Sequence, residues 1–86
     1  MKYKKLEFSE LEALAQEGDA QAQYFLSHRY LDAEGTALDE NKAFIWMKKS
    51  AEQNNAQAQY HLGVLYAGGI GTEASLKQAF LWIKRS

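Results

Sequence analysis

Two residue types that commonly constrain small proteins, cysteine and proline, are missing from this chain of 86 residues. Without cysteine the chain can form neither disulfides nor thiolate metal sites, which suits a reducing compartment. Without proline, every residue keeps the backbone N–H that a helix interior requires. A long apolar run is also missing behind the basic N-terminus, because Glu7, Glu10 and Glu12 follow closely. We therefore expect a cytoplasmic chain with no signal peptide and no membrane-spanning helix.

A strong excess of one charge is absent as well. The chain has 10 lysines and arginines against 11 aspartates and glutamates, which gives a formal net charge of -1. This balance disfavours binding to nucleic acid or to an anionic membrane. Hydrophobic residues make up 47% of the chain and aromatic residues 13%. That content is enough for the packed core of a single small domain spanning residues 1–86.

An internal duplication is the main feature of the sequence. The letters AQAQY at 20–24 recur at 56–60, a shift of 36 residues. With this shift, segments 15–50 and 51–86 share 15 identities in 36 positions, where about two or three are expected by chance. Phe8, Phe44 and Phe80 keep the same spacing. The chain therefore divides into a half repeat (1–19), a complete repeat (20–55) and a C-terminally incomplete repeat (56–86).

Each complete repeat is predicted to form two helices. In the first helix, Ala22, Leu26 and Tyr30 recur at i, i+4 and i+8 and give one apolar stripe. We expect helices near 8–17, 20–31, 40–53, 56–67 and 76–86, and no strand. Trp46 and Trp82 recur at a fixed helical position, which favours core packing over a stacking platform for bases or sugars.

Capping residues mark the predicted helix ends. Ser9-x-x-Glu12 and Ser75-x-x-Gln78 have the spacing of a capping box. The other predicted N-caps are Asp19, Asp39 and Asn55, and the predicted left-handed helix ends are Gly18 and Asn54. Stacked helical hairpins of this kind form an α/α superhelix, in which each repeat covers the apolar face of its neighbour. We predict an all-α, right-handed solenoid of antiparallel helix-turn-helix repeats, with about two and a half repeats and five helices.

The period and the residue pattern resemble the Sel-one-like repeat, a relative of the tetratricopeptide repeat. The residues that carry this resemblance are AQAQYHLGVLYAGGIG at 56–71, followed by AFLW at 79–82. The first complete repeat departs from the family pattern at Ser27, where the second has Gly63. We expect the two helices of the first repeat to lie slightly farther apart at that point.

The resemblance implies a non-catalytic adaptor. Such proteins present a concave groove, lined mainly by the first helix of each repeat, to a partner protein or peptide. Positions on the first helices that differ between the repeats are not dictated by packing, and arginine and aromatic residues often anchor interfaces. Our candidate partner-binding residues are Gln21, Phe25, His28, Arg29, Gln57, His61 and Val64. In the alternative interpretation, Phe25 packs between helices and the others are solvated.

Other functions find less support in the sequence. His28 and His61 occupy different repeat positions and have no evident third ligand, so we predict neither a metal nor a cofactor. No nucleophile–base pair or phosphate loop is recognisable, so we predict no catalytic residue. The alternatives left open are a small inhibitor or immunity-type binder of one partner, an enzyme or small-ligand binder acting on cell-wall or antibiotic molecules, and a structural spacer.

The last helix has no polar capping helix after it. Phe80, Trp82 and Ile83 are therefore expected to be partly uncovered. Two explanations remain open at this stage. The chain is a fragment of a longer array, or its open C-terminal face associates with another copy of the chain.

Overall fold

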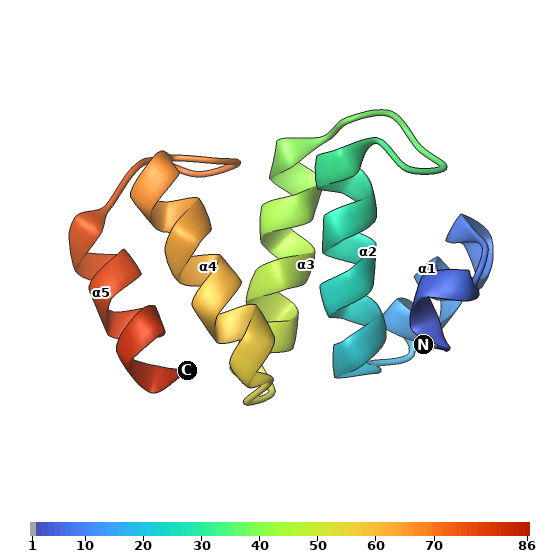
Figure 1. The fold of residues 1–86 in the computed structure, drawn as a ribbon, viewed down its shortest axis with the longest axis horizontal. Helices are drawn as coiled ribbons and strands as arrows, with labels where there is room; N and C mark the ends of the chain where they lie inside the picture. The colour runs from blue at the N-terminus through green and yellow to red at the C-terminus, as the bar shows by residue number, and fades with distance from the viewer. Residues whose placement is uncertain (1) are drawn as a thin grey trace.

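The structure, a computed structural model, describes residues 2–86 as five α-helices and one short 3-10 helix (Figure 1). The elements are η1 (Tyr3–Lys5), α1 (Phe8–Gln16), α2 (Ala20–Asp32), α3 (Glu40–Glu52), α4 (Ala56–Gly68) and α5 (Leu76–Arg85). All five predicted helices are present, and each differs from its predicted span by one residue at the C-terminal end. No residue from 2 to 86 lies in a strand. The predicted all-α class is therefore confirmed.

Side chains cap the start of four helices as predicted. Asp19, Asp39, Asn55 and Ser75 each accept a hydrogen bond from the backbone N–H three residues later, at 3.0 to 3.2 Å. Each bond satisfies one of the N–H groups that the first turn of a helix leaves without a partner. Equivalent caps therefore give equivalent starting points to α2 and α4, and to α3 and α5.

The predicted cap of α1 at Ser9 is wrong. α1 begins at Phe8, and the residue before it forms a reciprocal capping box with Glu10. In this box the backbone N–H of Glu7 donates to Oε1 of Glu10 at 3.0 Å. The earlier start places the Phe8 ring edge-on against Tyr30, with ring centroids 5.4 Å apart. The helix therefore starts where Phe8 can pack against α2, although Ser9 would be the better N-cap by local preference than Glu7.

Residues in the left-handed conformation end the first helices of both repeats. Ala33 follows α2 with a φ of 53°, and Gly69 follows α4 with a φ of 66°. Gly18 and Asn54, the predicted left-handed residues between repeats, have φ values of 100° and 65°. Only Gly lacks the Cβ that makes this conformation costly, so Ala33 is held under mild strain.

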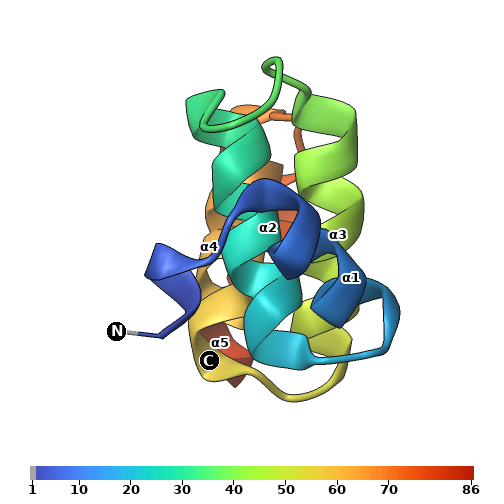
Figure 2. The same cartoon turned by 90° about the vertical axis from the view of Figure 1, so that its right-hand side faces the viewer.

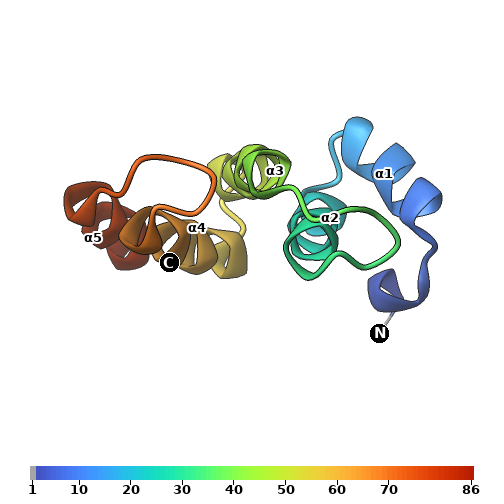
Figure 3. The same cartoon turned by 90° about the horizontal axis from the view of Figure 1, so that it is seen from above.

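The helices alternate between two layers. Seen from above, α2 and α4 lie on one side of the molecule and α1 and α3 on the other (Figure 3). η1 lies in the α2–α4 layer, beside α2, and the view along the chain from its N-terminal end shows the same placement (Figure 2). Each helix packs mainly on the helices adjacent to it in sequence. This zigzag is the solenoid arrangement predicted from the duplication.

Two equivalent glutamines connect each repeat to the helix before it. Gln23 and Gln59 are both buried. Their Nε2 groups donate to the backbone carbonyls of Ala15 and Ala51, at 3.1 and 3.2 Å. The two carbonyls lie at the C-terminal ends of α1 and α3, where a helix leaves acceptors unsatisfied. The second glutamine of each AQAQY segment therefore has a structural role.

Ser27 and Gly63 occupy equivalent positions inside the two hairpins, and the wider helix separation expected at Ser27 stays a prediction. The hydroxyl of Ser27 is fully buried and donates to the carbonyl of Ala43 at 2.5 Å. At Gly63 there is no room for a side chain, since a Cβ would overlap Cγ1 of Ile83 and come within 3.0 Å of the carbonyl of Ala79. The second hairpin closes around a position that must remain without a Cβ.

The two tryptophans belong to the packed interior, as predicted. Trp46 packs against the hydrophobic core and Trp82 is buried. The expected exposure of Trp82 is wrong, because the Arg85 guanidinium lies over its ring at 4.5 Å from the centroid. Phe80 and Ile83 are exposed as predicted.

Candidate partner-binding surface

The first helices of the two repeats bring five of the seven predicted residues to one side of the molecule. We call this the α2–α4 surface; it consists of Gln21, His28, Gln57, His61 and Val64. Nε2 of Gln21 and Oε1 of Gln57 are 3.5 Å apart, and the rings of His28 and His61 meet edge to face at 4.9 Å. Val64 is exposed, one turn beyond His61 on the same helix. Side chains of both repeats therefore contact each other across this surface.

An aromatic cluster forms the middle of the surface. The Tyr24 ring packs edge-on against His28 at 4.8 Å and against His61 at 5.4 Å. Tyr60 contacts His61 from the other side, at 5.5 Å. The predicted residues include both histidines but neither tyrosine, because the candidates were positions that differ between the repeats and Tyr24 and Tyr60 are identical. Within residues 2–86, Tyr60 is exposed.

The two histidines have different surroundings. Nδ1 of His61 lies 2.8 Å from the carbonyl oxygen of Gln57, so this nitrogen carries the hydrogen of the neutral ring. Burial lowers the pKa of His28 below 6.5, and the positive charges that His61 and Lys4 can carry lower it further, against an opposing effect of Asp32. Within residues 2–86, Nε2 of His28 is buried and has no hydrogen-bond partner. The neutral form of His28 is thus favoured near pH 7.

A short hydrogen-bond chain holds the glutamines in place. Nδ2 of Asn55 donates to Oε1 of Gln21 at 2.9 Å. The same Gln21 side chain faces Gln57 of the next repeat. Gln21 therefore contributes to the contact between α2 and α4, whereas Gln57 is exposed to solvent.

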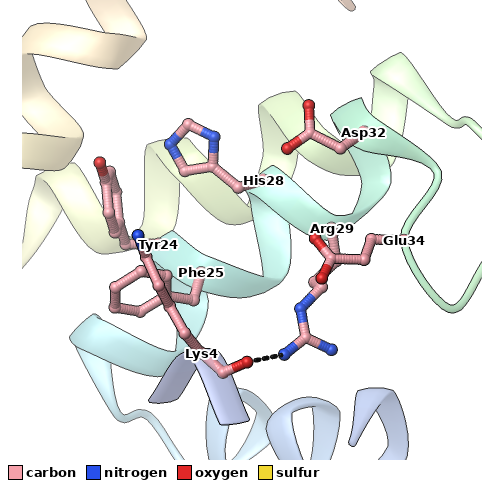
Figure 4. A pocket seen from close by; sticks show the side chains of 7 residues that line it. All are labelled: Lys4, Tyr24, Phe25, His28, Arg29, Asp32 and Glu34. Carbon is pink, nitrogen blue, oxygen red and sulfur yellow. Dashed lines mark hydrogen bonds between the residues drawn. The ribbon is translucent and has the colours of Figure 1, made fainter. Parts of the chain in front are cut away.

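The N-terminal segment covers the other two predicted residues. Nη2 of Arg29 donates to the carbonyl oxygen of Leu6 at 2.6 Å and to that of Lys4 at 3.3 Å (Figure 4). The Tyr3 ring stacks on Phe25, with centroids 5.8 Å apart and planes inclined by 13°. Phe25 and Arg29 are both buried. Both residues were expected to lie on an open surface. They instead hold residues 3–6 against α2.

A further hydrogen bond fixes the same segment at its start. The Tyr3 hydroxyl donates to a carboxylate oxygen of Asp19 at 2.9 Å. This bond raises the pKa of Tyr3, because it stabilises the protonated phenol next to a negative charge. Arg29 and Phe25 have no equivalents in the second repeat, where Leu65 and His61 stand instead. The difference between repeats therefore reflects an intramolecular neighbour of α2.

A hollow of about 340 Å³ remains between the N-terminal segment and the C-terminal half of α2. Its lining is formed by Lys4, Tyr24, Phe25, His28, Arg29, Asp32 and Glu34 (Figure 4). Both signs of charge are present, and aromatic rings form part of the wall. This chemistry suits one amphipathic side chain better than a strongly charged ligand.

The part of the chain that the structure describes, residues 2–86, contains no group of three or more histidine, aspartate or glutamate side chains placed to hold a metal ion. None of its helices combines the length and the apolar character needed to cross a bilayer.

Fold and surface together define an α-helical repeat protein of the solenoid class. The sequence matches the Sel1 repeat over residues 20–55 and again over 56–86. The chain therefore belongs to the Sel1 repeat family. Repeats of this family are generally protein–protein interaction modules and typically non-catalytic scaffolds.

Two solved structures of bacterial proteins share this fold. A Sel1 repeat protein from Oxalobacter formigenes is 36% identical, with a TM-score of 0.85, and the match covers 87% of this chain and 22% of the other. A protective antigen of uropathogenic Escherichia coli strains that displays an SLR fold is 33% identical, with a TM-score of 0.90. That match covers 94% of this chain and 17% of the antigen. This chain thus spans about a fifth of the length of these two proteins. Comparison with curated protein sequences finds no significant match.

Proposed function

We propose that this chain is a non-catalytic adaptor that binds a partner protein or peptide on the α2–α4 surface. The observation that carries the proposal is the aromatic cluster of Tyr24, His28, Tyr60 and His61, in which both repeats contribute rings to one side of the molecule. Tyr60 is exposed and the two histidines are half-buried, whereas Tyr24 is buried beneath them. Accessible aromatic rings bury large areas with little loss of side-chain entropy, so they are frequent anchors of protein interfaces.

The hollow beside the cluster gives the partner a place for one side chain. His28 and Tyr24 belong to both the cluster and the hollow lining. A peptide lying across His61 and His28 could insert a side chain next to Asp32 and Lys4. The lining contains no serine, threonine or cysteine that could serve as a hydroxyl or thiol nucleophile. The bacterial sources of both similar structures support a bacterial setting, and the cytoplasmic location stays a prediction.

The test is affinity capture from a bacterial lysate with three forms of the chain. The intact chain is compared with a His28→Ala/His61→Ala double variant and with an Ile45→Ala/Lys49→Ala control. Both control residues are exposed on α3, in the opposite layer. Circular dichroism checks that all three forms are equally helical.

A partner retained by the intact chain and the control, but lost with the double variant, is the expected result. Equal retention by all three forms would show that the α2–α4 surface is not the binding site. Phe25 and Arg29 are unsuitable probes, because replacing either would release the N-terminal segment and change stability together with binding.

A further inference from the structure

Arg29 is a buried cation whose hydrogen-bond donors are only partly used. Its side chain is 8% exposed, and charged residues are rarely buried this far unless an opposite charge accompanies them. Its only acceptors within residues 2–86 are the backbone carbonyls of Lys4 and Leu6, both bound by Nη2. No carboxylate in this part of the chain forms an ion pair with Arg29. The guanidinium therefore has no counter-ion.

The free donors of Arg29 face the hollow between the N-terminal segment and α2. Nε and Nη1 make no hydrogen bond within residues 2–86, and neither is among the buried polar atoms that lack a partner, so solvent reaches them. Arg29 is part of the hollow lining. A carboxylate that enters the hollow could therefore accept two parallel hydrogen bonds, the arrangement that the planar guanidinium favours.

The other wall of the hollow combines rings with a second cation. Tyr24 and Phe25 provide the rings, and the Lys4 side chain extends beside Phe25 toward Tyr24 (Figure 4). The hollow has a volume of about 340 Å³, close to that of about ten water molecules in the liquid. It can thus take one residue that carries both an apolar side chain and a carboxylate.

The acidic residues of the lining distinguish two sources of that carboxylate. Asp32 ends α2 and Glu34 follows it, and both line the hollow. They would repel an aspartate or glutamate side chain that brought nothing but negative charge. The last residue of a peptide instead offers its carboxylate to Arg29 and its backbone N–H to Asp32. The presence of both signs of charge therefore favours a chain terminus.

The second repeat lacks this set of polar residues. The positions equivalent to His28, Arg29, Asp32 and Glu34 are occupied by Val64, Leu65, Gly68 and Ile70. The repeat can therefore form its hairpin with apolar residues or glycine at all four positions. The contact with the N-terminal segment accounts for Arg29, whereas Asp32 and Glu34 take no part in its hydrogen bonds.

We propose that the hollow binds the C-terminal residue of a partner peptide, with the terminal carboxylate on Arg29 and Lys4, the backbone N–H on Asp32 and an apolar side chain against Tyr24 and Phe25. This inference rests on the proposed function, since it assigns which part of the partner lies beside the α2–α4 surface.

The test compares three short peptides by NMR titration of the ¹⁵N-labelled 86-residue chain at pH 7 and low salt. Acetyl-Gly-Gly-Phe has a free terminal carboxylate, and a second peptide has the same sequence with a terminal amide. The third, acetyl-Gly-Glu-Phe amide, carries its carboxylate on a side chain. Arg29 and Arg85 are the only arginines of the chain. The Nε–H signal of Arg85, which lies over Trp82 on α5, is therefore an internal control.

We expect the free acid to bind at least about tenfold more tightly than either amide, and to shift the Nε–H signal of Arg29 but not that of Arg85. Lys4→Glu should weaken binding of the free acid about tenfold, because it reverses a charge in the lining. Lys5→Glu makes the same change at an exposed neighbour outside the lining and should alter binding less than about twofold.

Four results would overturn the proposal. They are equal binding of the free acid and its amide, an Arg29 signal that does not move, equal losses with the two lysine variants, and binding of the glutamate peptide as tight as that of the free acid. The last would identify an acidic side chain as the ligand.

The adaptor role and this inference can fail separately. A partner captured through the histidines, with no peptide bound in the hollow, would remove only the terminal-carboxylate site. A free-acid peptide that shifts the Arg29 signal, with no partner lost on changing the histidines, would instead remove the proposed role of the α2–α4 surface.

Discussion

The two repeats share one sequence pattern but differ in the neighbours that cover them. α2 and α3 lie between α1 with η1 on one side and α4 on the other, whereas α4 and α5 are covered on one side only. Residues at equivalent positions therefore range from fully buried, as at Met47, to substantially exposed, as at Ile83. In a repeat protein, the contribution of a residue to the free energy of unfolding depends on the neighbouring repeat as well as on its own side chain.

The largest expected effect compares those two residues directly. Met47→Ala should lower the free energy of unfolding by about 2–5 kcal/mol, because it leaves a cavity at a completely buried position of α3. Ile83→Ala should cost only about 1 kcal/mol, since solvent already reaches that side chain. Urea denaturation followed by circular dichroism measures both. Equal losses would show that Ile83 is as well packed as the buried Met47.

A smaller effect is expected where the hairpins close. Gly63→Ser should cost about 1–3 kcal/mol, since its Cβ would overlap the β-branched Ile83. The first repeat accommodates Ser27 and has the flexible Met47 at the position equivalent to Ile83, so adding Ile83→Met to Gly63→Ser should restore part of the loss. Urea unfolding of the single and double variants gives the coupling energy. Strict additivity would mean that the two positions do not compensate each other.

The left-handed ends of α2 and α4 offer a stabilising change. Ala33→Gly should raise the free energy of unfolding by about 0.5–1 kcal/mol, because glycine adopts the φ of 53° without the Cβ contact that strains alanine. In thermal unfolding this corresponds to an increase in Tm of about 2–8 °C for a domain of this size. The matched change Gly69→Ala should act in the opposite direction. A lower Tm for Ala33→Gly would show that backbone entropy outweighs the strain.

The smallest effect concerns pH. The pKa of His28 is lowered in the folded state, mainly by burial, so protonation favours the unfolded chain. The contribution of neutral His28 to the free energy of unfolding should be fully present above about pH 6.5. It should be lost as the pH decreases from there through the folded pKa of His28. The second repeat has Val64 at this position, so His28→Val is the matched control. Its free energy of unfolding should decline less between about pH 7 and pH 5.5. Identical pH profiles would exclude His28 as the titrating group.

Most of the fold could be predicted because several signals coincide at each helix. Asp19 and Asn55 cap α2 and α4, and Ala22, Leu26 and Tyr30 supply the apolar stripe of α2. The duplication then repeats the same information 36 residues later. Local preference and packing agree at these positions, which is why the predicted and observed spans differ by a single residue.

The N-terminal segment could not be predicted in the same way. η1 has three residues, too few to show a period, and its position depends on contacts with Phe25 and Arg29 more than 20 residues away. Because these two residues differ between the repeats, they were predicted to bind a partner protein. The structure instead shows an intramolecular occupant. A difference between repeats indicates a difference in neighbours, and only coordinates can tell which neighbour it is.

The sequential packing of the helices also determines how the chain should open. Substantial contacts join each helix to the next, and no helix returns to close the stack upon itself. Such an array can lose its last hairpin while the rest remains folded. The amide hydrogens of α5 should therefore exchange with solvent faster than those of α2 and α3.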